Sequence, residues 1–278
     1  MNQENDNQRT PEEVRGVYEH IADEYDQRLA SDKLLDRRFM ETEEAFVLSK
    51  VNPSDEVLDL ACGTGRLTLP LAKKCKHVTG SDISASMIAK ARMKAEEQGL
   101  DIEFHEGSMT KLPFADESFD VITSMLALMH ITPEERLQVF GEAARVLRPG
   151  GRMITGVKNS VFERFCKADR FLAKDKTVIE QKELVFTENT SGTDLTIPWY
   201  SFSPQDLSSL FSQVGMNVVH LKGLMPLTAW LADGVLEDPQ VYRTANMLEE
   251  LFSDIPPINH LGYYLLVEAV KLGGRRGA

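Results

Sequence analysis

Two acidic residues and a pair of glycines form the part of this sequence whose spacing indicates chemistry. Asp59 ends an apolar run, and Gly63 and Gly65 follow it in the segment Asp59-Leu-Ala-Cys-Gly-Thr-Gly. Glycines directly after a buried strand let the backbone approach a ligand at the carboxyl edge of a sheet. Asp82 follows Gly65 by 82 − 65 = 17 positions, near the spacing of about 20 at which an acid reaches the hydroxyls of a bound ribose. The arrangement therefore predicts a cofactor that contains a nucleoside.

The residues around the glycines distinguish two classes of nucleoside cofactor. A dinucleotide site requires a third glycine, where this chain has Thr68, and presents helix N–H groups to a pyrophosphate. Asp59 instead puts a fixed negative charge beside the ligand, which favours a cofactor with a sulfonium and an ammonium group. We therefore prefer a methyl donor to a dinucleotide. A purely structural role stays open for each acid, Asp59 as a strand-end cap and Asp82 as a helix-entry cap.

Short apolar runs alternate with helical patterns around these residues. Strands are predicted at residues 56–60, 77–82, 102–105, 119–123, 152–157, 217–221 and 263–269. Helices are predicted to begin after Ser84, Thr132 and Ser203, each of which can serve as an N-cap. Repeated alternation with short connections implies an α/β fold, in which helices cover both faces of a mostly parallel sheet.

The N-terminal part has a helical pattern from residue 11 to about residue 50. One apolar stripe recurs at three- and four-residue spacing and comprises Val14, Val17, Tyr18, Ile21, Ala22 and Tyr25. The two tyrosines on this stripe fit two roles, either a lid over a ligand or packing in the core.

Five segments follow one another in an order that is more specific than any one of them. They are Asp59-Leu-Ala-Cys-Gly-Thr-Gly, Ser81-Asp82-Ile83-Ser84, Gly107-Ser108-Met109 with Leu112-Pro113-Phe114, Phe119-Asp120-Val121-Ile122, and Leu147-Arg148-Pro149-Gly150-Gly151. Together they resemble the class I S-adenosylmethionine-dependent methyltransferases, nearest the small-molecule branch that contains an LPF segment. The resemblance covers residues 14–157 well and residues 200–222 loosely. It implies a Rossmann-like, doubly wound, mostly parallel sheet of seven strands, with helices on both faces and an α-rich lid or insertion.

The resemblance also implies a site for S-adenosyl-L-methionine, with S-adenosyl-L-homocysteine as the product. Asp59 and the backbone around Ala61, Gly63 and Gly65 would hold the methionine end. Asp82 would bind the ribose hydroxyls. The remaining contacts would come from Ile83 and Met109 to the adenine, from Met125 beside the methionine part, and from Tyr25 folded over the cofactor.

Two positions depart from the family pattern. Ser108 stands where the family usually has an acid that bonds the adenine amino group, and a serine would accept that bond more weakly. Met129 replaces the first histidine of a frequent His-His pair and leaves His130 alone. His130 is either a base or donor facing the transferred methyl group, since histidine titrates near neutrality, or a packed residue before a helix.

Four aromatic residues are candidates for the substrate side. They are Tyr18, Trp199, Tyr200 and Trp230. The last three lie in the two predicted insertions, residues 158–200 and about 223–260, where this fold usually builds its substrate wall. Core packing is the competing interpretation. No triad or metal motif is evident, and displacement at a sulfonium requires none, because the electrophile is already activated.

Composition limits the setting in which such a protein acts. The chain has 278 residues and a net charge of −12, which disfavours a surface that follows nucleic-acid phosphates. The three cysteines, Cys62, Cys75 and Cys166, form no CxxC pair, so we expect no metal site and a reducing compartment. The sequence has no apolar run that could span a membrane, and its N-terminus resembles no secretory signal. These features predict a cytoplasmic protein with a small-molecule partner, and they leave a homodimer open.

The predicted organisation has four parts. A helical lid is expected at residues 1–50, the cofactor-binding core at 51–157, a substrate-side insertion at 158–200, and the completion of the sheet at 201–278. The predicted function is methyl transfer from S-adenosylmethionine to an oxygen, nitrogen or carbon atom of a small molecule. The alternatives are a methyltransferase of RNA or protein, and a member that binds the cofactor without catalysis.

Overall fold

The computed structural model describes residues 11–29, 34–165, 176–178, 183–189, 192–231 and 233–273. Residues 1–10 of the predicted N-terminal lid and Cys166 lie outside these ranges.

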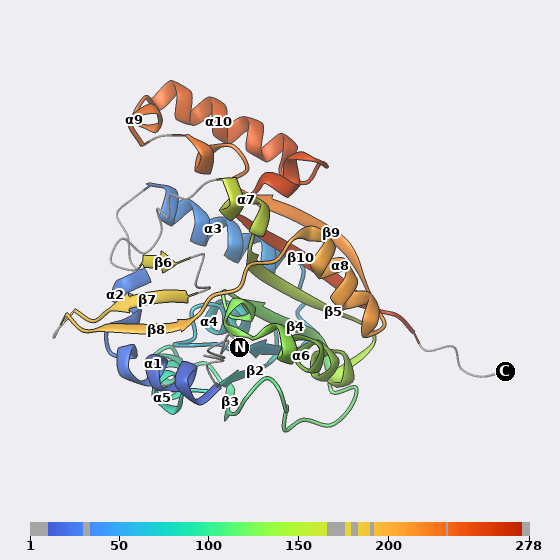
Figure 1. Cartoon of the computed structure of the whole chain (residues 1–278). Helices are drawn as coiled ribbons and strands as arrows, with labels where there is room; N and C mark the ends of the chain where they lie inside the picture. The colour runs from blue at the N-terminus through green and yellow to red at the C-terminus, as the bar shows by residue number, and fades with distance from the viewer. Residues whose placement is uncertain are drawn as a thin grey trace, which may run out of the picture.

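A seven-stranded sheet forms the centre of the molecule, in the order β3-β2-β1-β4-β5-β10-β9 (Figure 1). Its strands are β1 Glu56–Leu60, β2 His77–Asp82, β3 Glu103–Glu106, β4 Phe119–Met125, β5 Leu147–Lys158, β9 Met216–Leu224 and β10 Tyr264–Lys271. The first five pair in parallel, and β10 runs antiparallel between β5 and β9. The seven predicted strands and the mostly parallel, doubly wound sheet are confirmed.

The strand order reverses between β1 and β4, which are hydrogen-bonded neighbours. From β1 the chain continues to β2 and β3 on one side, and from β4 to β5 on the other. Open α/β sheets bind ligands outside the carboxyl ends of their strands at such a switch point. The candidate residues Asp59 and Met125 lie at these ends of β1 and β4.

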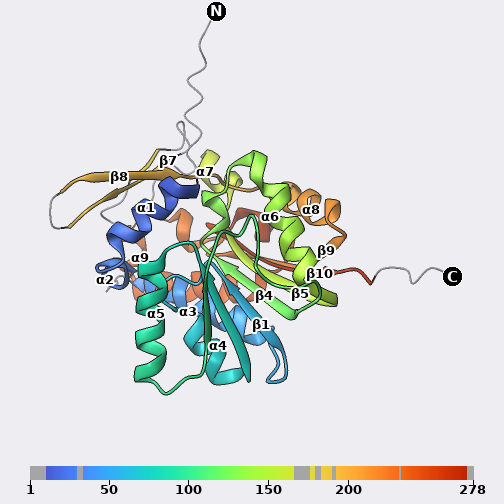
Figure 2. The same ribbon diagram turned by 90° about the horizontal axis from the view of Figure 1, so that it is seen from below.

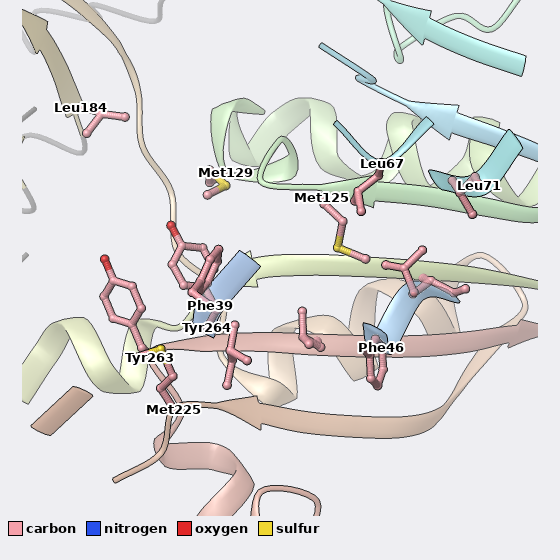
Figure 3. Packing of buried hydrophobic residues seen from close by; sticks show 14 of the residues in the cluster. Phe39, Phe46, Leu67, Leu71, Met125, Met129, Leu184, Met225, Tyr263 and Tyr264 are labelled. Carbon is pink, nitrogen blue, oxygen red and sulfur yellow. The ribbon is translucent and has the colours of Figure 1, made fainter. Parts of the chain in front are cut away.

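Helices cover both faces of the sheet (Figure 2). Their bounds are α1 Pro11–Ile21, α2 Tyr25–Leu29, α3 Leu34–Ser49, α4 Thr68–Lys74, α5 Ala85–Glu97, α6 Pro133–Val146, α7 Ser160–Phe165, α8 Pro204–Gln213, α9 Asp233–Leu236 and α10 Pro239–Phe252. Neighbouring residues of β1 point to opposite faces, because side chains alternate along a strand. Val57 packs in a cluster with residues of α3, α4 and α5, part of which Figure 3 shows, whereas Leu58 packs in a cluster with residues of α6 and α8.

The predicted caps begin these helices. The Ser84 hydroxyl accepts a hydrogen bond from the backbone N–H of Met87, which starts α5. Thr132 with Glu135, and Ser203 with Asp206, form capping boxes at the starts of α6 and α8.

A second, three-stranded antiparallel sheet lies in the segment 158–200 and was not predicted. It consists of β6 Lys176–Val178, β7 Glu183–Thr187 and β8 Asp194–Pro198. Ile197 of β8 and Leu184 of β7 are buried, and β8 runs beside α1. This small sheet therefore braces the N-terminal helix on the side of the main sheet's carboxyl edge.

The predicted helical insertion near residues 223–260 contains α9, α10 and the short 3-10 helices η2 Thr228–Trp230 and η3 Ile258–Leu261. In Figure 1, α9 and α10 lie beyond α3 and α7, away from β1 to β3. Among the helices of the described ranges, none combines the length and apolar character that crossing a bilayer requires.

Candidate functional site

A cavity opens at the carboxyl ends of β1, β2 and β4, and α1 and α2 cover it. It is lined by Pro11, Val14, Tyr18, Tyr25, Leu60, Ala61, Gly63, Asp82, Ile83, Met87, Gly107, Ser108, Met109, Thr110, Met125, Leu126, Ala127, His130, Ile131 and Glu135. We call it the main cavity. Ten of the residues proposed from the sequence therefore lie around one space: Tyr18, Tyr25, Ala61, Gly63, Asp82, Ile83, Ser108, Met109, Met125 and His130.

The backbone at the edge of the main cavity adopts an uncommon conformation at two non-glycine residues. Ala61 has φ 60° after β1, and Leu126 has φ 57° after β4. Left-handed backbone is unfavourable for residues with a Cβ, and such strain collects at ligand sites. Gly65 does not line the main cavity. Its φ is +88°, and an added Cβ would lie 3.4 Å from the Ala91 Cβ, so this glycine lets the loop pack closely on α5.

Asp59 is 3% exposed and connects three elements. Its Oδ2 accepts a hydrogen bond of 2.6 Å from the Thr68 hydroxyl in α4, and its Oδ1 accepts one of 2.7 Å from the Thr123 hydroxyl in β4. Burial raises the pKa of the Asp59 carboxyl, and the two hydroxyls oppose this shift. Asp59 lies on a smaller cavity next to the main one, so it both fixes the glycine loop and faces the ligand space.

Asp82 ends β2 and reaches the main cavity. Its Oδ2 accepts from the Gly63 N–H at 2.8 Å, and its Oδ1 accepts from the Ser84 N–H at 2.9 Å. Burial raises the pKa of Asp82 from 3.8 to about 6. Each carboxylate oxygen has a second lone pair, so the side chain can still accept hydrogen bonds from a ligand. The structural and the ligand-binding interpretations of this residue are therefore compatible.

His130 lies on the wall of the main cavity. Two neighbouring groups determine which of its ring nitrogens carries the hydrogen. Its Nδ1 is 2.8 Å from the Pro198 carbonyl oxygen, which can only accept, so Nδ1 carries the hydrogen. The other nitrogen, Nε2, then has a free lone pair and accepts from the Tyr18 hydroxyl at 2.9 Å. Burial lowers the pKa of His130 to about 4, so the ring is neutral at pH 7.

The apolar stripe predicted at residues 14–25 spans α1 and the start of α2, and it serves both roles proposed for it. Val17, Ile21 and Ala22 are buried in the core. Tyr18 and Tyr25 line the main cavity, and their rings meet edge to face with 6.0 Å between centroids. Burial raises the pKa of Tyr25 to about 12, which keeps its hydroxyl protonated.

Polar contacts hold α1 and α2 over the main cavity. The Glu19 carboxylate accepts from the Ala85 and Ser86 N–H groups, at 2.7 and 3.2 Å, at the start of α5. Asp26 accepts from the Thr64 hydroxyl at 2.6 Å and pairs with Lys94. These bonds tie the lid to the glycine loop and to α5.

Ser108 has a local partner on the wall of the main cavity. Its hydroxyl lies 2.8 Å from the Thr110 hydroxyl, and it accepts from the Thr110 N–H at 3.2 Å. Thr110 also lines the main cavity and was missed in the sequence. Two hydroxyls, instead of one acid, therefore face the ligand here.

Three of the aromatic residues proposed for the substrate side do not line the main cavity. Trp199 is buried behind His130, with 5.9 Å between ring centroids, and its indole N–H donates to Glu163. Tyr200 stacks near the Arg136 guanidinium, at 5.6 Å. Trp230 is 36% exposed, donates to the Leu261 carbonyl and packs on Phe162 of α7. Of the four, only Tyr18 lies at the site.

The smaller cavity contains residues that the sequence analysis missed. It is lined by Tyr25, Asp59, Ala61, Cys62, Gly63, Thr64, Arg66, Leu67, Met125 and Leu126. Arg66 forms an ion pair with Glu43 of α3, whose side chain is fully buried. Burial raises the pKa of the Glu43 carboxyl, whereas Arg66 favours its ionised form. The pair is separated by 23 positions, so no local pattern in the sequence indicates it.

Comparisons with known proteins agree with this geometry. Residues 57–151 match the family model described as a methyltransferase domain. A demethylmenaquinone methyltransferase of Mycobacterium sp. (strain JLS) is 34% identical over 146 residues, which cover 52% of this chain and 60% of the relative. One of Thermus thermophilus is 41% identical over 100 residues, or 35% of this chain and 44% of the relative. The matches thus span about three fifths or less of these relatives' length.

Solved structures show the same fold over most of the chain. A magnesium protoporphyrin IX methyltransferase from Synechocystis PCC 6803 with bound S-adenosylhomocysteine has a TM-score of 0.60 at 19% identity, covering 93% of this chain and 98% of that one. An S-adenosylmethionine-dependent methyltransferase from Mesorhizobium loti has a TM-score of 0.55 at 20% identity, covering 85% and 100%.

Proposed function

We propose that this chain, which contains a class I S-adenosylmethionine-dependent methyltransferase domain, binds S-adenosylmethionine in the main cavity and transfers its methyl group to a small-molecule acceptor. The observation that carries the proposal is the position of Asp82. Its buried carboxylate reaches a cavity at the strand-order switch point, beside a loop whose glycines leave room for a ligand.

The residues fit the cofactor in charge and shape. Asp59 and Asp82 supply two buried carboxylates where the sulfonium and ammonium groups would lie. Asp82 would accept from the ribose hydroxyls, and Ile83 would pack on the adenine. Ser108 and Thr110 would accept from the adenine amino group, in place of the acid found in other members. Tyr25 would close over the sulfur end.

Bound S-adenosylmethionine supplies an activated methyl group, so the chain's own residues position the acceptor, exclude water and take up a proton. Tyr18 and His130 line the space in which the acceptor would lie. A hydroxyl of the acceptor could replace the Tyr18 hydroxyl at Nε2 of His130. The neutral ring would then take the proton of that hydroxyl as the bond between its oxygen and the methyl group forms and the sulfur–methyl bond breaks. Nδ1 then keeps its hydrogen bond to Pro198 and holds the ring in place.

The lining of the main cavity disfavours a negatively charged acceptor. Of the described residues that line it, none is a lysine or an arginine. Val14, Met125, Leu126 and Ile131 give it apolar walls. The names of the relatives point to an apolar acceptor, demethylmenaquinone, for those proteins. We infer an acceptor with an apolar body and a hydroxyl or an acidic C–H group, and the net charge of −12 does not favour RNA.

Other parts of the sequence-based account stay predictions. The cytoplasmic location, the division into four parts and the homodimer belong to this group. Exposed apolar side chains of α10, among them Met247, Leu251 and Phe252, offer one surface for self-association.

The experiment is a transfer assay with S-adenosylmethionine that carries a labelled methyl group. Uncharged phenols and hydroquinones are compared with primary amines and carboxylates of similar size. We expect label in the uncharged acceptors, and loss of transfer in Asp82→Ala. Transfer confined to amines or carboxylates, or to RNA, would contradict the proposed acceptor class. Absence of transfer to every acceptor by a protein that binds the cofactor would favour the non-catalytic alternative.

A further inference from the structure

We propose that the outer face of α10 binds the same face of a second copy of this chain, so that two antiparallel α10 helices form the contact of a homodimer. The outer face consists of the exposed apolar side chains Val241, Met247, Leu251 and Phe252, together with Ile255 in the turn that follows the helix. Helix α10 lies at the edge of the molecule in Figure 1, and none of these residues lines the main cavity.

Helix α10 is amphipathic, but its apolar side faces outward. Met247 and Leu251 are four positions apart, so they lie on one side of the helix, and they are 54% and 60% exposed. The side that faces the protein instead carries the carboxylate of Glu249, which is buried. A helix on the surface of a globular protein usually turns its apolar stripe toward the core. The inverted pattern indicates that another molecule covers the outer face.

Polar contacts hold α10 in this orientation. Glu249 Oε1 accepts hydrogen bonds from the N–H groups of Leu227 and Thr228, at 3.0 and 2.7 Å. Glu249 Oε2 lies 3.1 Å from the guanidinium of Arg38 in α3. Rotating the helix to bury its apolar side would break all of these contacts. A partner that docks from outside covers the outer face and leaves them intact.

Two charged residues beside the outer face make it complementary to itself. Arg243 precedes Met247 by four positions and Glu250 follows it by three, so both lie on one side of the helix next to Met247. When two such helices pack antiparallel about a twofold axis near Met247, Arg243 of each copy lies opposite Glu250 of the other. In the described part of a single chain neither side chain forms an ion pair, so both are available to a partner.

The one polar side chain within the outer face also tolerates burial. The Thr244 hydroxyl donates to the Gln240 carbonyl at 2.8 Å, within the same helix. Covering Thr244 therefore leaves no donor without an acceptor, and burial of the surrounding apolar surface stabilises the contact.

A lipid surface is the competing occupant. Helices that lie in the interface of a bilayer usually carry lysine and arginine on their polar side, which anionic headgroups attract. Helix α10 contains one arginine, Arg243, and two glutamates, Glu249 and Glu250, in a chain whose net charge is −12. Charge therefore favours a second copy of the chain, whose Arg243 and Glu250 match those of the first.

Sedimentation velocity of the full chain tests this contact from about 1 to about 100 µM, a range in which a micromolar Kd becomes visible. We expect the native chain to change from monomer to dimer as its concentration rises. Met247→Glu should weaken the dimer by about 10-fold or more, because each copy would then bury an unpaired carboxylate. Met93→Glu is the matched control, since Met93 lies on α5 and is 48% exposed, and it should leave the dimer unchanged.

The two reciprocal ion pairs allow a second test by exchange of charge. Arg243→Glu alone and Glu250→Arg alone each create two like-charged pairs in a homodimer, so each should dimerise about three- to tenfold more weakly than the native chain. An equimolar mixture of the two variants should dimerise more tightly than either alone, because the mixed dimer contains two pairs of opposite charge. A dimer formed elsewhere on the chain gives no such recovery.

A native chain that stays monomeric at the highest concentration would overturn the proposal. Dimers that Met247→Glu leaves unchanged, or a mixture that dimerises no better than its components, would also overturn it. A monomeric native chain that sediments with phosphatidylcholine vesicles, when Met247→Glu does not, would assign the outer face to a lipid surface instead. Thermal unfolding of each variant confirms that the protein is folded. Failure to bind S-adenosylmethionine would bear on the proposed function and not on this contact.

Discussion

Tyr18 and His130 lie 112 positions apart in the sequence and meet across the main cavity, where the Tyr18 hydroxyl donates to His130 Nε2 over 2.9 Å. Tyr18 belongs to the lid helix α1, and His130 ends η1 (Leu128–His130) behind β4. The bond therefore joins the lid helix directly to the proposed base. It also shields the Nε2 lone pair until another hydroxyl takes the place of the phenol.

Replacing His130 tests whether it serves as the base. His130→Gln should lower kcat by about 10²- to 10⁴-fold, the usual contribution of a positioned base, with the affinity for S-adenosylhomocysteine nearly unchanged. With S-adenosylmethionine saturating, kcat of the native protein should persist down to mildly acidic pH. The neutral ring is required for the proton transfer, so kcat falls only as the pH drops through about 4, the pKa of His130 in the folded protein.

The exposed His77 provides the matched control, His77→Gln, which should leave kcat unchanged. A profile of kcat against pH that fell near pH 6.5, measured with saturating cofactor, would place an unperturbed histidine, or another group, in the role of the base. If kcat were unaltered in His130→Gln, His130 would have a structural role in packing and would not serve as the base.

Asp59 should matter for stability as well as for binding. Asp59→Ala removes the acceptor of the Thr68 and Thr123 hydroxyls and leaves two buried donors without a partner. We expect the free energy of unfolding to fall by about 2–4 kcal/mol, since a buried unsatisfied donor costs about 1–3 kcal/mol. Urea denaturation measures the change, with the exposed Asp101→Ala as the control. If Asp59→Ala lowered the free energy of unfolding by no more than the control does, the hydrogen bonds that join β1, α4 and β4 through Asp59 would contribute little to stability.

Glu19 should control the lid. Glu19→Ala removes the acceptor for the Ala85 and Ser86 N–H groups, a contact of the kind that caps helices and is worth about 0.5–2 kcal/mol. Hydrogen exchange should therefore become faster in α1, and S-adenosylhomocysteine should dissociate faster. Glu12→Ala, at an exposed position of the same helix, is the control. Unchanged exchange in α1 would mean that apolar packing alone holds the lid.

The strands and the two acids could be predicted because their signals are local. Asp59 and Asp82 each lie at the end of a predicted strand, and Gly63 and Gly65 follow Asp59 within a few residues. The pattern therefore specifies a switch-point site without knowledge of distant contacts. The N-caps Ser84 and Thr132 are local in the same sense. The periodicity of residues 14–25 also identified Tyr18 and Tyr25, but it gave no means to decide between the core and the cavity.

What the sequence missed depends on contacts between distant segments. Glu43 looks like any acid on a polar helix, and only the packing of α3 on the glycine loop brings it to Arg66. Trp230 lies in an insertion where a substrate wall was expected, yet it packs on Phe162. The small sheet around β7 was missed because its strands, Lys176–Val178, Glu183–Thr187 and Asp194–Pro198, are too short to give a clear periodic signal.

The central claim is most directly tested by calorimetric titration of S-adenosylhomocysteine into the native protein and Asp82→Asn between pH 5 and pH 8. Asp82 has a pKa of about 6 in the free folded protein, above its ordinary 3.8, so ionising it lowers stability as the pH rises through about 6. Hydroxyls of a bound ribose would stabilise the ionised form. The account predicts binding that is strongest above pH 7 and weakens as the pH falls through about 6, and binding by Asp82→Asn that is weak and independent of pH. A folded native protein that fails to bind, or an Asp82→Asn variant that binds as tightly as the native protein, would contradict it.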